Sequence, residues 1–358
     1  MSGGRDMADV TKIEWTHRPG TKGCTWNPIR ARRVFEPAGN FGKLGWHCEH
    51  VSEACRNCYA ERLNMKLGAT GGTGLAYKPG HRLGDEPDVE VFLDETVLVR
   101  PGLWRAPRTI FVCSMTDLFA DFVLDEWLDK IFAVAALCPQ HTFIMLTKRP
   151  ERMQAYLRHD EANLWQDLRM RWFRAGENIC PDRAVPLHFI AQCRVYPLPN
   201  VWLGVTAEDQ PNASERTAVL RQTPAAVRLV SCEPMVGLID LSGMLSSWKD
   251  DPFTKDAFHS GHAPTPGLGG FVNWVICGGE TGPNARPMHP NWARSLRDQC
   301  KTAGVPFFFK QWGEFSPDDS QIVGPQVVLD GGVRMRLIGK KRAGRLLDGI
   351  KHNDFPAR

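Results

Sequence analysis

The sequence predicts an α/β protein built around a parallel sheet, and three observations support this prediction. Short apolar runs alternate with segments of helical periodicity along most of the 358 residues. The runs do not alternate strictly between polar and apolar residues, which is typical of strands that are covered on both faces. Each run also ends in polar, charged or glycine residues, at the position where α/β sheets and barrels keep their active sites.

The predicted elements follow one another as strand and helix. The predicted strands span residues 109–114, 141–148, 200–209, 225–234, 271–280 and 305–312. The predicted helices lie at 124–138, at 149–159, from about Ala213 onward and from Pro290 to Ala303. Three insertions interrupt this order, at 66–108, 155–199 and 242–270. We therefore expect one α/β domain over residues 1–315 and a C-terminal extension over residues 316–358.

The composition is that of a globular protein rather than a membrane-spanning one. The sequence is 42% hydrophobic and 23% charged, which are ordinary values for a chain with a sizeable core. It contains no run of about 18 apolar residues, and its first residues lack the apolar core of a signal peptide. We therefore expect a cytoplasmic protein without membrane contact. The net charge of +4 allows an anionic partner without requiring one.

The strand ends provide candidate ligand-binding residues. Because the carboxyl ends of parallel strands meet at one edge, residues that follow different runs should gather in one site. Helix capping would explain Thr116, Asp117 and Glu208 equally well, but it does not explain Lys148 or the glycine pair at 278–279. The candidates are Ser114, Thr116, Asp117, Lys148, Thr206, Glu208, Glu233, Gly278, Gly279 and Glu280.

A cysteine-rich loop precedes most of these strands. The stretch "WHCEHVSEACRNCYAERLN" places Cys48, Cys55 and Cys58 in a C-x6-C-x2-C array. In a reducing cytosol, closely spaced thiols favour metal ligation over disulfides. The other eight cysteines have no close thiol neighbour in the sequence, and we expect them to be core residues: Cys24, Cys113, Cys138, Cys180, Cys193, Cys232, Cys277 and Cys300.

Two kinds of metal site suit such a loop. A structural zinc ion needs four ligands, so the fourth would have to come from His47, His50 or Cys24. An iron–sulfur cluster usually takes four thiolates. If only three are supplied, one iron stays open to bind a substrate or a cofactor.

Several longer segments resemble the radical S-adenosylmethionine (SAM) superfamily and, within it, an uncharacterised phage and bacterial family related to spore photoproduct lyase. The matching segments run in order from about residue 11 to 315 and include "CEHVSEACRNCYAER", "SMTDLFAD", "TFIMLTKRPERM", "NVWLGVTAEDQ" and "WVICGGETGPNARPMHPNWARSLRDQC". The array departs from the superfamily's usual C-x3-C-x2-C spacing, in which an aromatic residue precedes the last cysteine. Here Asn57 precedes Cys58, and Tyr59 follows it.

The resemblance implies a fold and a chemistry. The fold would be a partial (β/α)6 TIM-like barrel of the radical SAM type with loop insertions, and the cysteine loop would lie at its carboxyl-terminal mouth. Cys48, Cys55 and Cys58 would hold three irons of a [4Fe–4S] cluster, and SAM would bind the fourth. An electron donor such as flavodoxin or ferredoxin would trigger release of a 5′-deoxyadenosyl radical. The expected reaction is modification or repair of a nucleotide or nucleic acid of phage or host.

The resemblance also assigns cofactor contacts to the strand ends. Tyr59 would stack on the cofactor or form a hydrogen bond with it, and Lys148 would pair with the carboxylate of SAM, where a fixed cation is suitable. The remaining expected contacts of the cofactor are Ser114, Thr116, Asp117, Thr206, Glu208, Glu233, Gly278, Gly279 and Glu280.

Residues close to the cysteine loop suggest a surface for nucleic acid. Arg30, Arg32 and Arg33 follow shortly after Trp26, and a mixture of cationic and aromatic residues suits a nucleotide or a nucleic-acid strand. A solvated basic loop would have the same composition. A non-catalytic, zinc-containing nucleic-acid-binding protein is therefore the alternative to a radical SAM enzyme.

Overall fold

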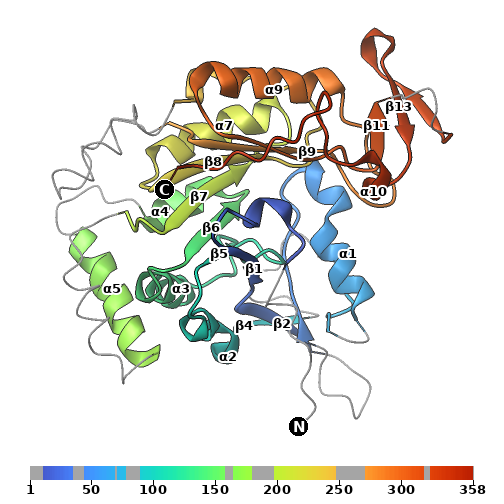
Figure 1. The fold of residues 1–358 in the computed structure, drawn as a ribbon. Coiled ribbons are helices and arrows are strands. Elements are labelled where there is room, and N and C mark those ends of the chain that lie inside the picture. Colours follow the sequence, from blue (N-terminus) through green and yellow to red (C-terminus); the bar gives the residue numbers. More distant parts are fainter. Residues whose placement is uncertain are drawn as a thin grey trace.

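A computed structural model describes residues 11–34, 44–68, 71–77, 89–157, 164–179, 197–246, 271–317 and 323–357. Its centre is a seven-stranded sheet in which every pair of neighbouring strands is parallel (Figure 1). The strand order is β1-β5-β6-β7-β8-β9-β10. The predicted α/β class is therefore confirmed.

Six of the seven strands are those that the apolar runs predict. The sheet consists of β1 (Lys22–Trp26), β5 (Arg108–Val112), β6 (Thr142–Thr147), β7 (Val201–Thr206), β8 (Val227–Cys232), β9 (Trp274–Gly278) and β10 (Phe307–Gln311). Strand β1 was not predicted, because its "KGCTW" segment is short and contains few apolar residues. The spatial order follows the chain order without reversal, as it does in barrels.

Helices follow the strands as predicted. The α-helices are α1 (Tyr59–Lys66), α2 (Glu95–Leu98), α3 (Asp125–Leu137), α4 (Pro150–Leu157), α5 (Leu164–Ile179), α7 (Gln210–Gln222), α9 (Pro290–Ala303) and α10 (Lys340–Ala343). Short 3-10 helices lie at Glu14–Thr16 (η1), Glu53–Asn57 (η2), Arg100–Leu103 (η3), Ser242–Met244 (η4) and Asp330–Gly332 (η5). Helix α7 begins before the predicted Ala213, because the Asp209 side chain caps it by accepting a hydrogen bond from the Asn212 backbone N–H at 3.0 Å.

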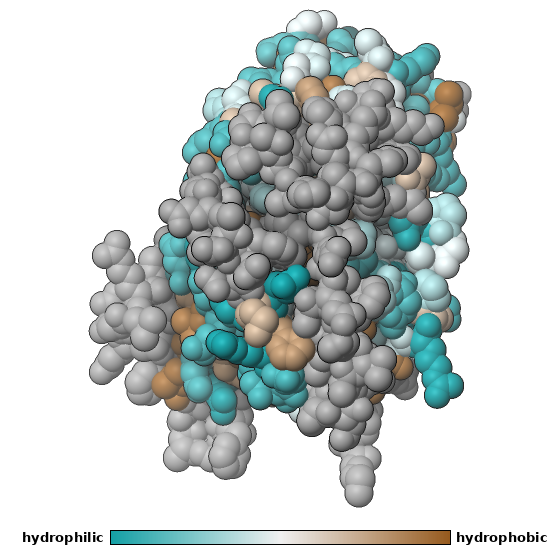
Figure 2. All heavy atoms as spheres, turned by 90° about the vertical axis from the view of Figure 1, so that its left-hand side faces the viewer, coloured by the Kyte–Doolittle hydropathy of each residue, from teal (hydrophilic) through white to brown (hydrophobic). Residues whose placement is uncertain are grey.

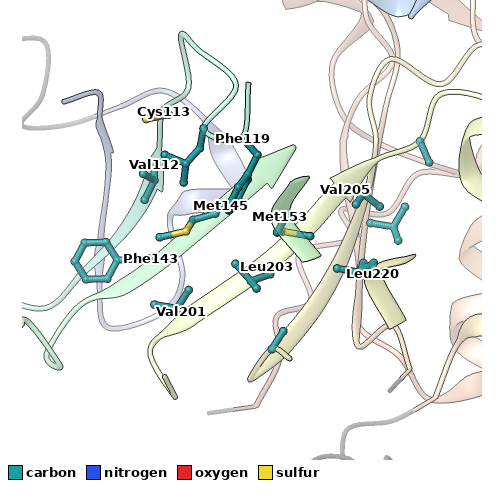
Figure 3. Packing of buried hydrophobic residues seen from close by; sticks show 14 of the residues in the cluster. Val112, Cys113, Phe119, Phe143, Met145, Met153, Val201, Leu203, Val205 and Leu220 are labelled. Carbon is teal, nitrogen blue, oxygen red and sulfur yellow. The ribbon is translucent and has the colours of Figure 1, made fainter. Parts of the chain in front are cut away.

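The outer face of the sheet packs against helices that include α4 and α7. Phe143 and Met145 of β6 and Leu203 of β7 belong to one buried cluster with Met153 of α4 and Leu220 of α7 (Figure 3). Successive side chains of a strand point to opposite faces, so the residues between these positions face the inside of the curved sheet. Cys24, Cys138, Cys232, Cys277 and Cys300 are buried in the outer cluster, as expected for core cysteines.

The inner face carries an aromatic floor toward the amino ends of the strands. Trp202 of β7 and Trp274 of β9 pack edge to face with ring centroids 5.9 Å apart, and Trp15 of η1 meets Trp274 at 6.3 Å. Trp15, Ile144, Trp202, Val227, Leu229, Trp274, Ile276 and Phe308 form this buried cluster. The inward positions that follow along the strands are polar, charged or glycine: Lys148, Thr206, Ser231, Glu233, Gly278 and Lys310. The closed floor thus lies under a polar mouth.

We expect Gly204→Ala in β7 to lower the free energy of unfolding by about 1–3 kcal/mol, because overpacking forces neighbours out of place. A Cβ atom at Gly204 would lie 2.5 Å from Leu229 Cγ and 2.8 Å from Leu146 Cδ2. Urea denaturation would measure the loss. The matched control is Gly243→Ala in η4, where no atom lies within 4 Å of the added Cβ. Equal stability of the two variants would contradict the close packing at Gly204.

Two antiparallel sheets of three strands flank the parallel sheet. One has the order β3-β2-β4, with β2 (Ile29–Arg33), β3 (Leu44–Gly45) and β4 (Val89–Leu93). The other has the order β11-β13-β12, with β11 (Phe315–Pro317), β12 (Gln326–Val328) and β13 (Arg334–Leu337). The predicted boundary at residues 315–316 therefore falls inside β11. The chain then returns beneath the floor, where the Trp274 indole donates to the Asp354 carbonyl oxygen at 2.9 Å.

The predicted insertions are partly structured. The first contains β4, α2 and η3, and the second contains α5, whose Trp172 stacks on Phe132 of α3 at 5.1 Å. The third is described only as far as residue 246, and the rest of it lies outside the described residues. On the face that carries α5, the described side chains are largely hydrophilic with isolated hydrophobic areas (Figure 2). Among the helices that the structure describes, none is both long and apolar enough to cross a bilayer.

Candidate functional site

The cysteine loop lies over the carboxyl ends of β6 and β7. Cys55 belongs to η2, and Cys58 directly precedes α1. Lys148, the first residue after β6, places its Nζ atom 3.4 Å from Cys55 Sγ. The Ser52 hydroxyl in the same loop donates to Oε1 of Glu208, which follows β7, at 3.2 Å. Loop residues and strand ends that are 93 and 156 positions apart in the chain therefore form one site.

The three thiols have different environments. Burial and the nearby Asp117 carboxylate raise the pKa of Cys48 to about 12, and burial also raises the pKa of Cys58. Burial acts in the same direction on Cys55, but the Lys148 ammonium and backbone N–H groups outweigh it, so the pKa of Cys55 is lowered. Cys55 is therefore the thiol that ionises most readily. In the part of the chain that the structure describes, no three Cys, His, Asp or Glu side chains are close enough together to hold a metal ion.

A buried charge network joins the loop to the strand ends. Glu208 is 1% exposed, and its carboxylate lies 2.8 Å from Lys148 Nζ and 3.0 Å from Arg216 Nη1 of α7. Burial favours the neutral amine of Lys148, but Glu208 and the Cys55 thiolate raise its pKa, so the lysine stays charged. The resemblance to radical SAM enzymes implies that Lys148 and Glu208 each contact the cofactor. The structure instead pairs them with each other.

Asp117 is also engaged within the protein. Its carboxylate accepts hydrogen bonds from the Thr147 hydroxyl at 2.7 Å and from the Lys148 backbone N–H at 3.0 Å. Arg149 bridges Asp117 and Glu49 at 3.3 Å each. These contacts fix the end of β6 and hence the position of Lys148. The cofactor contact that the resemblance implies for Asp117 would have to compete with them.

The hydroxyls of Thr116 and Thr206 have unused hydrogen-bonding capacity. Both Oγ1 atoms are buried, and neither has a hydrogen-bond partner among the described residues. Buried polar atoms are normally paired, so an unpaired one calls for an explanation such as a bound molecule. Both residues are among the predicted cofactor contacts.

Tyr59 and Ser114 meet at the mouth. The Tyr59 hydroxyl donates to the Ser114 carbonyl oxygen at 2.6 Å. The residue as a whole is 45% exposed. Burial of the hydroxyl raises the pKa of Tyr59, so it remains a neutral donor. The Ser114 hydroxyl donates to Asn27 Oδ1 at 3.2 Å. Tyr59 therefore offers a fixed, partly exposed ring next to Cys58.

A second lysine–glutamate pair lies on the far side of the mouth. Lys310 of β10 places Nζ 3.0 Å from Glu233 Oε1, and the Ser231 hydroxyl donates to Glu233 Oε2 at 3.2 Å. A Cβ atom at Gly278 would lie 2.6 Å from Glu233 Oε1, so this glycine leaves room for the carboxylate. Lys310 was not among the predicted site residues, because it follows "FFF" in a strand predicted to be buried. Its inward position in the alternation of β10 was the signal that could have found it.

The turn after β9 connects the sheet to the cysteine loop. A Cβ atom at Gly279 would lie 1.9 Å from the Trp312 carbonyl oxygen, so only glycine allows this approach. Glu280 pairs with Arg286 at 2.7 Å, which lowers the pKa of Glu280 in spite of its partial burial. From the other side, Arg62 of α1 donates to the Thr281 carbonyl oxygen at 2.7 Å.

A family model for a protein of unknown function (DUF5131) matches residues 10–356. The chain belongs to this family. Comparisons with curated proteins and with solved structures found no match. The family match includes the parallel sheet, the cysteine loop and the C-terminal sheet.

In this member of the DUF5131 family, the predicted substrate-binding residues differ from expectation. Trp26 is a core residue, because it is 1% exposed and donates its indole N–H to the Val97 carbonyl oxygen. It was predicted to lie at the surface because β1, the strand that contains it, was not recognised in the sequence. Arg30 stacks on Trp46 with its guanidinium carbon 4.6 Å from the ring centroid. Arg32 pairs with Glu90 at 3.2 Å. Arg33 ends β2 and is half-buried. The prediction that Trp26 binds the substrate is therefore withdrawn.

The candidates for a fourth zinc ligand are dispersed. Cys24 lies in β1 and is fully buried in the outer core, away from the mouth. His50 Nε2 lies 3.0 Å from Glu61 Oε2. His47 is buried, with its ring 5.2 Å from that of Phe122.

Proposed function

We propose that the protein is a radical SAM iron–sulfur enzyme whose cluster is held by Cys48, Cys55 and Cys58. The observation that carries the proposal is the 3.4 Å contact between Lys148 Nζ and Cys55 Sγ. It joins the cysteine loop to the carboxyl end of a parallel sheet, which is where α/β barrels keep their active sites. The finer fold proposed with it is the partial (β/α)6 barrel, supported by strand order without reversal.

The residues at the mouth fit a cluster and a second ligand. Three thiolates leave one iron open, and a cation beside Cys55 offsets part of their negative charge. The unpaired hydroxyls of Thr116 and Thr206 provide polar contacts for a molecule bound beside the cluster. Since the thiols are not gathered at ligand distance in this structure, we expect the cysteine loop to close when it takes up iron.

In the proposed enzyme, the chain's own residues would bind the cluster and SAM, orient the substrate and shield the site from water. With electrons from a donor such as flavodoxin or ferredoxin, a cluster held by the three cysteines and bound SAM would supply a 5′-deoxyadenosyl radical. Tyr59 presents its ring to the mouth, and the ion-paired Lys148 and Lys310 lie beside it. The aromatic floor closes the sheet below the mouth and keeps water from entering there. The proposed substrate class is a nucleotide or a nucleic acid.

Metal analysis of anaerobically purified protein tests this proposal. We expect a brown protein with about four iron and four sulfide per chain and a broad absorbance near 400 nm, as thiolate-bound clusters give. A colourless protein with about one zinc per chain would overturn it. That result would favour a zinc-containing nucleic-acid-binding protein.

A further inference from the structure

The positive charge of the chain is concentrated in one segment near the C-terminus. Residues 323–345, here called the basic wing, contain six lysines and arginines and one acidic residue, a net charge of +5. The whole chain carries +4, so all other residues together carry −1. The basic wing comprises β12, β13, α10 and the residues that connect them. A local concentration of one sign of charge is the electrostatic footprint of a polyanion site.

Four of the six cations are available to a partner. Arg334, Lys340, Lys341 and Arg342 are exposed, and their side chains form no ion pair or hydrogen bond with any residue that the structure describes. Arg345 differs, because it covers the Phe308 ring with its guanidinium carbon 4.7 Å from the centroid. The arginines of β2 are engaged too, as Arg30 and Arg32 show. The free cations of the basic wing therefore form a better anion surface than β2.

The basic wing is attached to the mouth. The Glu314 carboxylate accepts hydrogen bonds from the Gly282 backbone N–H at 2.8 Å and from the Lys340 backbone N–H at 3.0 Å. Gly282 belongs to the turn after β9, which Arg62 of α1 contacts through Thr281. Figure 1 shows α10 and β13 on the same side of the molecule as α1. The start of α10 is thus held beside the turn that closes the site.

We propose that the basic wing binds the phosphate backbone of a nucleic-acid strand. Consecutive cations on a short turn can contact successive phosphates without reading the bases. Binding of the phosphate backbone itself needs no cluster. Only the path of the bound strand into the mouth rests on the proposed function. It names the substrate of the proposed enzyme as a nucleic-acid chain rather than a free nucleotide.

Fluorescence anisotropy with a labelled single-stranded DNA of about 20 nucleotides tests the proposal on the full chain as purified. We expect Lys340→Glu/Lys341→Glu/Arg342→Glu to weaken binding at least about tenfold at low salt. The slope of log affinity against log salt concentration should also become shallower by about two, because three phosphate contacts are lost and each contributes about 0.7 to that slope for single strands.

The matched control changes the same net charge at the opposite end of the sheet. Lys12→Glu/Lys22→Glu/Arg105→Glu alters three exposed cations near the amino ends of β1 and β5, and we expect it to retain most of the affinity. Equal loss in the two triple variants would overturn the proposal, because net charge alone would then explain binding. Tighter binding to anionic lipid vesicles than to DNA would overturn it as well. Circular dichroism melting confirms folding of both variants, and unchanged iron content would separate this proposal from that of the cluster.

Discussion

We expect incorporation of the proposed [4Fe–4S] cluster to be abolished by each of three changes, Cys48→Ala, Cys55→Ala and Cys58→Ala. Each change removes one of the three thiolates of the array, which leaves only two protein thiolates for the cluster. Iron and sulfide analysis after anaerobic reconstitution measures the effect. We expect less than about a tenth of the iron of the unmodified protein, because a cluster with only two protein thiolates is not retained.

Cys24→Ala provides the matched control. Cys24 is fully buried in the outer core, so its loss should lower the free energy of unfolding by about 1 kcal/mol through a small cavity and leave the iron content unchanged. Full iron in Cys55→Ala, or loss of iron in a folded Cys24→Ala protein, would show that a different set of cysteines binds the metal.

Glu208→Ala will destabilise the protein by about 3–5 kcal/mol, because removing one partner of a buried ion pair leaves the other charge unpaired. Here the carboxylate has two cationic partners, Lys148 and Arg216, and its own side chain is 1% exposed. Urea or guanidinium denaturation at pH 7 measures the loss. We also expect faster reaction of Cys55 with a thiol reagent in Glu208→Ala, since Lys148 would then be free to pair with the Cys55 thiolate.

Asp298→Asn is the surface control for this prediction. Asp298 pairs with Arg297 at 2.8 Å, but its side chain is 60% exposed, and exposed pairs contribute at most about 1 kcal/mol. A loss in Glu208→Ala no larger than that in Asp298→Asn would mean that the charge network does not hold the strand ends together.

The sequence predicted most strands of the parallel sheet, because each of these strands is identified by the residues of its own segment. Runs such as "TFIMLT" and "NVWLGVT" are apolar enough to be recognised without knowledge of their neighbours. Strand β2, "IRARR", has an alternating pattern of small or apolar and arginine residues whose pairing with β4 is non-local. It was therefore read as a basic loop, and Trp26 in the unrecognised β1 was read as a surface residue.

The sequence predicted which residues lie close together at the candidate site, but not which of them pair with each other. The carboxyl-end rule correctly brought Lys148 and Glu208 to one edge of the sheet, yet it could not show that they pair with each other. That pairing depends on the neighbouring positions of β6 and β7 and on the rotamers of two long side chains. Lys310 was missed for a related reason, because its direction in β10 depends on the register of a strand that appeared uniformly apolar.

The most direct test of the radical SAM proposal is electron paramagnetic resonance of the anaerobically reconstituted, dithionite-reduced protein before and after addition of SAM. We predict the signal of a reduced [4Fe–4S] cluster, a change in that signal when SAM binds the open iron, and release of 5′-deoxyadenosine into solution. A signal that SAM leaves unchanged, together with no 5′-deoxyadenosine, would contradict the proposal even if the protein contains iron.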